Sequence, residues 1–119
     1  MAKSLHDAQH EVYLVINAQV FPIQENVVRI GRKLDNDVVI QDALISRYHA
    51  EIRLAEDGTY KIFDLGSTSG TFLNNKQVKE STLFSGDIIL FANVPVMFVS
   101  ERKDLDSKGE ADTGKLLKG

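Results

Sequence analysis

Three short stretches of the chain concentrate side chains that can donate hydrogen bonds to an anion. Arg32 follows an apolar run, Ser46 and Arg47 precede another, and Thr68 lies in a loop flanked by glycines. An arginine presents a planar fork of N–H donors that matches two phosphate oxygens, and each hydroxyl adds one further donor. A phosphate monoester near neutral pH carries a charge of about −1.5 to −2 and three acceptor oxygens. These residue types therefore favour a phosphate-binding site, provided that the fold brings the three stretches together.

The elements that must position these side chains are predicted to be strands. Short apolar runs alternate with turns rich in Gly, Asn, Asp and Ser, and no stretch of ten residues between 12 and 100 shows helical apolar spacing. This pattern is typical of an all-β sandwich or barrel, and loops at one end of such a scaffold form a natural binding surface. Strands are expected at 12–16, 20–23, 27–30, 38–40, 50–54, 60–65, 71–73, 88–92 and 94–99, with a short hairpin ending at Val78.

Turn residues and prolines predict some of the connections. Asp57-Gly58 suits a hairpin turn, because this pair tolerates positive φ. A proline has no N–H to donate to a neighbouring strand, so it is confined mainly to sheet edges and bulges. Pro22 and Pro95 each predict an edge position for their strand.

Composition limits the class of protein. A chain of 119 residues is predicted to form one domain with its own core. The absence of cysteine excludes disulfides and thiolate metal sites, and it suits a reducing, cytoplasmic location. The net charge of −3 does not favour nucleic acid, which usually binds a basic face. No apolar run approaches the ~20 residues that a membrane-spanning helix needs.

The two ends of the chain differ from the middle. Residues 1–10 contain mixed charges and no apolar segment of the kind that marks a secretory signal, so a flexible arm is expected. Residues 101–119 contain many charged and small residues and few large apolar ones. Such a segment buries too little surface to offset its ordering entropy, and it is expected to be a flexible tail or a linker. The domain itself is expected at residues 11–100.

Taken together, the motifs resemble the forkhead-associated (FHA) domain family. The resemblance covers about residues 12–99, in the order and spacing that the family shows, and the combination of motifs is highly specific. The residues that carry it are Gly31-Arg32, Ser46-Arg47-Tyr48-His49-Ala50, the run from Asp64 to Asn74, and Gly86-Asp87.

This resemblance implies a sandwich of about eleven short strands in two twisted sheets. It also implies a phosphothreonine peptide bound by loops at one end. In the family, the residues corresponding to Arg32 and Ser46 contact the phosphate, Arg47 assists, and the residue at Thr68 approaches it. The position of Ser69 is usually Asn, which holds the peptide backbone beside the phosphothreonine.

Four further residues are expected to support the site. The family uses the histidine at His49 to brace a loop by hydrogen bonds. Gly31 belongs to the Gly-Arg motif. Gly66 and Gly70 are expected to serve backbone shape, since glycine alone adopts positive φ without steric cost.

Catalytic interpretations of the same residues are weaker. His49 could pair with Ser46 or Asp64, but it precedes an alternating strand, where a structural role is favoured. The loop from Gly66 to Gly70 is not a nucleotide-binding P-loop, because the lysine and the following helix are missing. It is not a nucleophile elbow either, because Thr68 stands where a serine is needed and the context is all-β.

Metal-binding interpretations are weak as well. His6 and His10 have the spacing of two ligands on one helical face, but two ligands in an expected flexible arm make a poor site. Asp35-Asn36-Asp37 lacks the following glycine and the distal glutamate of a calcium loop. No metal and no cofactor is predicted.

The resemblance therefore implies an interaction module and not an enzyme. Its partner would be a threonine-phosphorylated protein or peptide, the product of a Ser/Thr kinase, with no role for nucleic acid or membrane. The alternative is a phosphate-independent interaction domain that keeps the fold and has lost phosphopeptide recognition. The sequence leaves the oligomeric state open.

Overall fold

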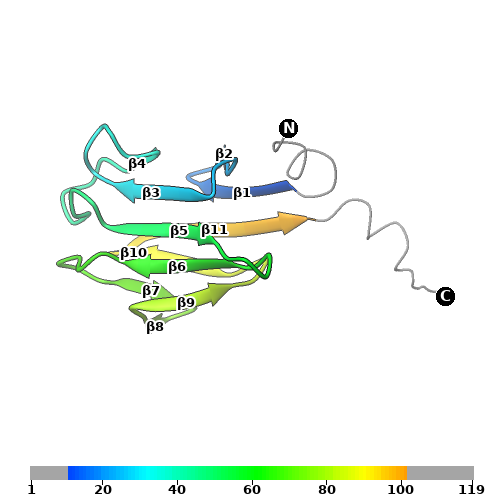
Figure 1. The fold of residues 1–119 in the computed structure, drawn as a ribbon. Coiled ribbons are helices and arrows are strands. Elements are labelled where there is room, and N and C mark those ends of the chain that lie inside the picture. Colours follow the sequence, from blue (N-terminus) through cyan, green and yellow to red (C-terminus); the bar gives the residue numbers. More distant parts are fainter. Residues whose placement is uncertain (1–10, 102–119) are drawn as a thin grey trace.

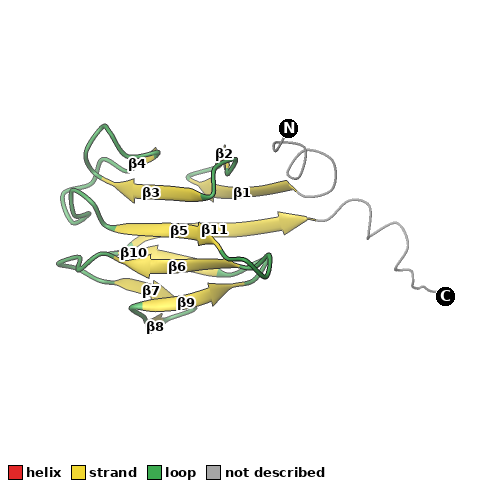
Figure 2. Ribbon diagram, in the orientation of Figure 1, coloured by secondary structure: helices red, strands yellow, loops and turns green. Residues whose placement is uncertain are grey.

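Strands whose side chains face the core and the solvent in turn build two β-sheets that pack face to face (Figure 1). The computed structural model describes residues 11–101. These residues form eleven strands and their connecting loops, without a helix (Figure 2). A helix long and apolar enough to cross a membrane is accordingly not found among them. The predicted all-β sandwich of about eleven strands is confirmed.

One sheet has six strands and contains both ends of the described chain. Neighbouring strands run antiparallel, and β1 pairs with β11 from Glu11↔Glu101 to Val15↔Met97. In spatial order the strands are β2 (Gln19–Pro22), β1 (Glu11–Ile16), β11 (Val94–Glu101), β10 (Ile88–Phe91), β7 (Thr71–Leu73) and β8 (Lys76–Gln77).

The second sheet has five strands and carries two of the loops predicted to bind phosphate. β3 pairs antiparallel with β5, and β5 with β6, while the two-residue strand β4 pairs in parallel with the end of β3. In spatial order the strands are β4 (Val38–Val39), β3 (Val27–Gly31), β5 (Ala50–Leu54), β6 (Tyr60–Asp64) and β9 (Glu80–Leu83).

The core lies between the sheets. It consists of the side chains that face inward, which are every second residue along a strand. Along β1, Val12, Leu14 and Ile16 are buried, and the residues between them are partly exposed. Complete burial of a side chain of this size contributes roughly 1.5–3 kcal/mol. The core residues with almost no exposed surface include Leu14, Ile30, Ile52, Ile62, Ile89, Phe91, Val96 and Phe98.

Most strand and turn predictions are confirmed, and three differ. Gly58 has a φ of +90° in the β5–β6 turn, as Asp57-Gly58 predicted. β9 was not predicted, because Leu83 is its only buried residue and the other three are polar. β8 lies at Lys76–Gln77 and ends before Val78. The last strand continues to Glu101, two residues beyond the expected end of the strand at 99.

The two prolines have different outcomes. β2 is the outer strand of its sheet, so the edge position predicted from Pro22 is confirmed. The prediction from Pro95 is wrong, since β11 lies between β1 and β10. The reason is local: β1 pairs with β11 only from Met97 onward, whereas Pro95 pairs with Leu90 of β10. The missing N–H therefore falls where β11 has a neighbour on one side only.

The sheet order brings the predicted loops to one end of the sandwich. The loops after β3, before β5 and between β6 and β7 lie together at the left in Figure 1. The termini of the described chain, Glu11 and Glu101, lie toward the opposite end.

Candidate phosphate-binding site

Ser46 is the residue at which the three predicted loops meet. Its carbonyl oxygen accepts a hydrogen bond from the amide of Arg32, at 3.0 Å. Its hydroxyl oxygen accepts a hydrogen bond from the amide of Thr68, at 3.1 Å. Residues separated by 14 and 22 positions in the chain are thereby held around one serine. The structure brings Arg32, Ser46 and Thr68 together as the sequence predicted.

A buried histidine fixes the position of this serine. The His49 imidazole is fully buried, and its Nδ1 accepts a hydrogen bond from the Ser46 amide at 3.1 Å. Its Nε2 lies 2.9 Å from the carbonyl oxygen of Gly70, which can only accept. These partners fit the neutral tautomer with the proton on Nε2. The ring also packs edge-on against Phe91, with centroids 5.6 Å apart.

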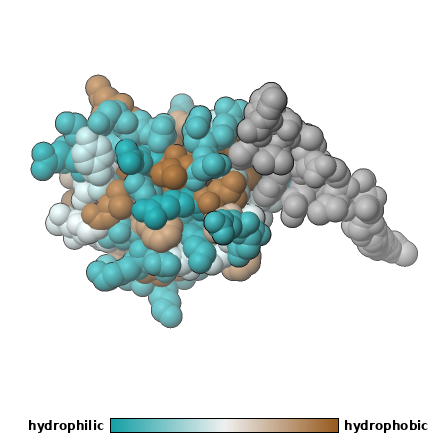
Figure 3. All heavy atoms as spheres, viewed as in Figure 1, coloured by the Kyte–Doolittle hydropathy of each residue, from teal (hydrophilic) through white to brown (hydrophobic). Residues whose placement is uncertain are grey.

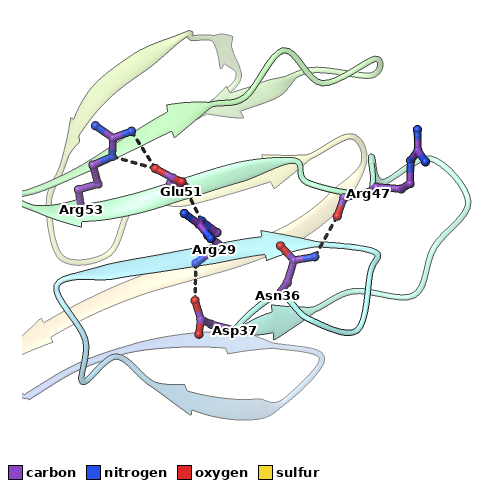
Figure 4. A network of polar contacts seen from close by, with 6 residues as sticks. All are labelled: Arg29, Asn36, Asp37, Arg47, Glu51 and Arg53. Atoms are coloured by element: carbon purple, nitrogen blue, oxygen red, sulfur yellow. Dashed lines mark hydrogen bonds and ion pairs between the residues drawn. The ribbon is translucent and has the colours of Figure 1, made fainter.

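The β3–β4 loop is tied to the β4–β5 loop by a second set of bonds, and Figure 4 shows the one from Asn36 to Arg47. The Asn36 amide nitrogen donates to the carbonyl oxygens of Lys33 and Arg47, at 2.8 and 2.9 Å. The Arg32 Nε donates to the carbonyl oxygen of Ile45 at 2.9 Å. Gly31 is needed at this crossing, because a Cβ there would collide with the Arg47 backbone and the Asn36 amide.

The β6–β7 loop is folded around the carboxylate of Asp64. One carboxylate oxygen accepts the Ser67 and Thr71 hydroxyls, and the other accepts the amides of Gly66 and Ser67. Burial of Asp64 would raise its pKa, but these four bonds favour the charged form and together hold the pKa below its usual value. The Ser67 hydroxyl oxygen also accepts the Gly70 amide.

The two glycines of this loop adopt backbone that other residues rarely use. Gly66 has a φ of +76° and Gly70 a φ of +92°. At Gly70 a Cβ would also approach the Gln77 amide and the Phe72 ring. A side chain at Gly70 would therefore disturb the carbonyl that His49 holds.

Several donors around Ser46 are left without a protein partner. Within residues 11–101, the Arg47 guanidinium, the Lys33 ammonium and the Thr68 hydroxyl make no hydrogen bond or ion pair. Figure 4 shows the Arg47 side chain pointing away from Asn36 and the loop crossing. Arg32 uses only its Nε, so its terminal nitrogens remain available. The site thus gathers positive charge and free donors on a chain whose net charge is −3.

The nearby acidic residues do not neutralise this charge. Asp35 and Asp37 are the acidic residues nearest to Arg32 in the sequence. In the structure, the Asp35 carboxylate accepts the Tyr48 hydroxyl, and Asp37 accepts the backbone amide of Arg29. No group of three metal-ligating side chains occurs among the described residues. His6 and His10 lie outside the described residues.

Ser69 is partly buried between Thr68 and Gly70. Its hydroxyl makes no hydrogen bond to the described part of the chain. It is therefore a free donor and acceptor next to the Ser46 contact.

Asn36 and Ser67 are the residues that sequence reasoning missed. Asn36 is 7% exposed and joins two loops, and Ser67 links Asp64 to Gly70. A lone Asn between two aspartates resembles any surface turn, and its role depends on a loop that follows eleven residues later. For Ser67 a signal existed: Asp64 precedes it by three residues, the spacing of a side chain that caps its own turn.

With this geometry established, comparison with known proteins becomes informative. The FHA domain model matches residues 28–92, which is more than half of the chain and includes all three loops. The chain belongs to the FHA domain family. The resemblance noted from the motifs is confirmed.

Individual relatives of this FHA domain agree in fold. It is 33% identical to the glycogen accumulation regulator GarA of Mycolicibacterium smegmatis over 91 residues, which are 76% of this chain and 57% of GarA. The structure of Mycobacterium tuberculosis EmbR in complex with a low-affinity phosphopeptide is 33% identical, with a TM-score of 0.71. That match covers 75% of this chain and 24% of the EmbR chain.

A third relative is a structure from an analysis of phosphothreonine-dependent FHA domain interactions. It is 30% identical, with a TM-score of 0.70, and the match covers 75% of this chain and 95% of that one. The present chain spans less than two thirds of GarA.

Replacement of His49 tests the loop brace. His49→Ala removes a buried ring and leaves the Ser46 amide and Gly70 carbonyl unpaired. We expect the free energy of unfolding to fall by about 2–4 kcal/mol, since each unsatisfied buried group costs about 1–3 kcal/mol. Tyr48→Phe is the control: it removes only the exposed hydrogen bond from the neighbouring Tyr48 hydroxyl to Asp35, and it should change stability by about 1 kcal/mol or less. Equal losses in chemical denaturation would contradict the brace.

The Asp64 carboxylate predicts a pH dependence of stability. Because its pKa is lower in the folded state, its bonds stabilise the fold fully above the unfolded value of about 3.9. This contribution is lost as the pH falls through the folded value. The destabilisation caused by Asp64→Asn should therefore be largest at neutral pH and shrink in acid. Urea denaturation of both proteins across that range tests this, and a difference independent of pH would refute it.

Proposed function

We propose that this FHA domain binds a phosphothreonine-containing segment of a partner protein at the loops around Ser46. The observation that carries the proposal is the set of uncommitted donors from Arg32, Arg47 and Thr68 around a serine that buried hydrogen bonds hold in place. The relatives described with a phosphopeptide or with phosphothreonine-dependent interactions support it.

Each donor has a definite task in this proposal. The Ser46 hydroxyl oxygen accepts the Thr68 amide, so its own hydrogen is free to point at a phosphate oxygen. The terminal nitrogens of Arg32 supply a fork for two further oxygens. Arg47 and the Thr68 hydroxyl complete the shell, with Lys33 adding charge. Charge-assisted bonds of this kind contribute roughly 1.5–3 kcal/mol each.

The same geometry favours binding over catalysis. A serine nucleophile needs a base within hydrogen-bond reach of its hydroxyl. His49 is the only imidazole in the described chain, and both of its nitrogens are bonded to backbone groups. We therefore propose an interaction module for the products of Ser/Thr kinases. The lack of cysteine agrees with a cytoplasmic location.

Arg32 gives the sharpest test of phosphate recognition. The wild-type domain should bind a selected phosphothreonine peptide at about micromolar strength, near −8 kcal/mol. Arg32→Ala should abolish measurable binding in calorimetric titration, and Arg32→Lys should recover only part of it, because an ammonium lacks the fork. Arg53→Ala, at the other end of β5, is the matched control and should bind as the wild type does.

Matched phosphothreonine, phosphoserine and unmodified peptides complete this experiment. Equal affinity for phosphorylated and unmodified peptides would refute the proposal and favour the phosphate-independent alternative. Thermal unfolding shows whether Arg32→Ala still folds. If it does not, the bond to Ile45 is structural, and phosphate recognition is then judged from the binding of Arg32→Lys.

Ser69→Asn tests the peptide-backbone contact that the resemblance places at this position. An Asn amide offers both a donor and an acceptor, whereas the Ser69 side chain is shorter and its hydroxyl has no partner among the described residues. We expect the variant to bind the phosphopeptide more tightly by about one net hydrogen bond, ~0.5–1.5 kcal/mol. The gain should appear mainly as slower dissociation in surface plasmon resonance. Weaker binding would mean that Ser69 itself makes the contact for which the peptide is selected.

A further inference from the structure

The outer face of the six-stranded sheet is apolar across five strands. Its side chains alternate with the core residues, and pairing registers align them in three cross-strand rows. No charged residue lies within these rows. The central row is Val20, Val15, Met97 and Ile88; the flanking rows are Pro22, Tyr13 and Val99, and Pro95, Leu90 and Phe72.

Several of these residues are open to solvent. Val20 is 58% exposed, Met97 38% and Ile88 37%. Pro22 and Pro95 are exposed as well, and the remaining members are partly exposed. Single exposed apolar residues are ordinary, but a contiguous apolar surface of this kind marks an interaction site.

The other sheet shows how this fold covers an outer face with polar groups. There Glu51 lies between Arg29 and Arg53, with contacts of 3.0 and 2.8 Å (Figure 4). The Arg53 guanidinium covers the Phe63 ring at 4.3 Å. Figure 3, viewed with β3, β5 and β6 in front, shows hydrophilic residues around separate hydrophobic patches. The apolar surface is therefore a property of one sheet and not of the fold.

We propose that the outer face of the six-stranded sheet is a dimerisation surface that packs against the same face of a second copy of this chain. A two-fold dimer needs only one self-complementary surface, and an apolar face without charges meets itself without burying like charges. Glu11 and Glu101 pair with each other one row beyond Tyr13, at the edge of the face, and the Glu101 carboxylate accepts a hydrogen bond from the Tyr13 hydroxyl at 3.4 Å. A dimer centred on the row of Val15 would leave this edge in solvent. Two sheets of equal twist can pack face to face in the aligned manner that is common in β-sandwiches.

The size of the face sets the strength of the dimer. The three rows hold ten positions. With strands ~4.8 Å apart and rows ~7 Å apart, these positions and their side chains give a face of at most ~500 Å² per copy. The pair would bury ~1,000 Å², which is at the lower limit for a specific interface and well below the ~1,600 Å² of a standard one. The dimer is therefore expected to be weak and to depend on the concentration of the chain.

This surface is separate from the phosphate-binding loops, which lie at one end of the sandwich. The proposal does not depend on the proposed function. Both sites of a dimer remain open, because packing on the sheet face does not cover Ser46 or Arg32.

Sedimentation velocity and concentration-dependent NMR shifts test the proposal on the full chain. From ~10 µM to ~1 mM, the wild type should shift from monomer to dimer, and the moving amides should belong to β1, β10 and β11. Met97→Glu places a charge in the central row and should remain monomeric over this range. Val27→Glu is the matched control, because Val27 is 41% exposed on the other sheet, and it should dimerise as the wild type does.

Other outcomes overturn the proposal. A wild-type chain that stays monomeric at ~1 mM excludes a second copy, whether the face is then open or covered by another part of the chain. If Val27→Glu abolishes the dimer and Met97→Glu does not, the dimer forms through the five-stranded sheet. Thermal unfolding of both variants controls for folding, and Ile88→Lys replaces Met97→Glu if the latter unfolds.

Discussion

The hydrogen bonds of one buried imidazole hold this binding end together. His49 accepts the amide of Ser46, three residues earlier, and donates to the carbonyl of Gly70 in a different loop. Since both ring nitrogens are committed and the ring has no exposed surface, Ser46 and Gly70 cannot move independently. The same residue begins the pairing region of β5, because its amide donates to Ile30. The loops are thus anchored to the sheet at the point where the ligand would bind.

The remaining contacts divide the work between support and recognition. Support comes from side chains that bond within the loops. The Asp64 carboxylate accepts hydrogen bonds from Ser67 and Thr71 of its own loop, and the Asn36 amide donates to the carbonyls of Lys33 and Arg47. In the proposed function, recognition is left to side chains whose donors have no partner among residues 11–101. Arg32 does both, with Nε on the Ile45 carbonyl and its terminal nitrogens available. Such an arrangement lowers the cost of ordering the site when an anion binds, because the loops are already fixed.

The sequence predicted the strands and the site where local chemistry was decisive. A short apolar run predicted β1, alternation predicted β5, and donor types made Arg32, Ser46 and Thr68 the candidate site residues. The features it missed depend on distant partners. β9 has one buried residue, and it forms a strand because it pairs with the free edge of β6. Asn36 joins two loops only because the fold places the carbonyl of Arg47 beside its amide. Pro95 misled for the same reason, since the limit of the β1 pairing is not visible in the residues around it.

The outer faces of the two sheets differ in polarity, and the packing of the core does not require this difference. Burial of Glu51 would raise its pKa, but hydrogen bonds from Arg29 and Arg53 hold the pKa below its usual value. The outer face of the five-stranded sheet therefore carries paired charges that suit contact with water. The apolar rows on the outer face of the six-stranded sheet contain no such charge pair. Their contact with water is unfavourable, and packing against a second apolar surface would remove it. Two phosphate sites joined through that face would hold a doubly phosphorylated partner more tightly than either site alone, because the second binding step becomes intramolecular. Weak pairing of the domain would then act on affinity without altering any contact at Ser46.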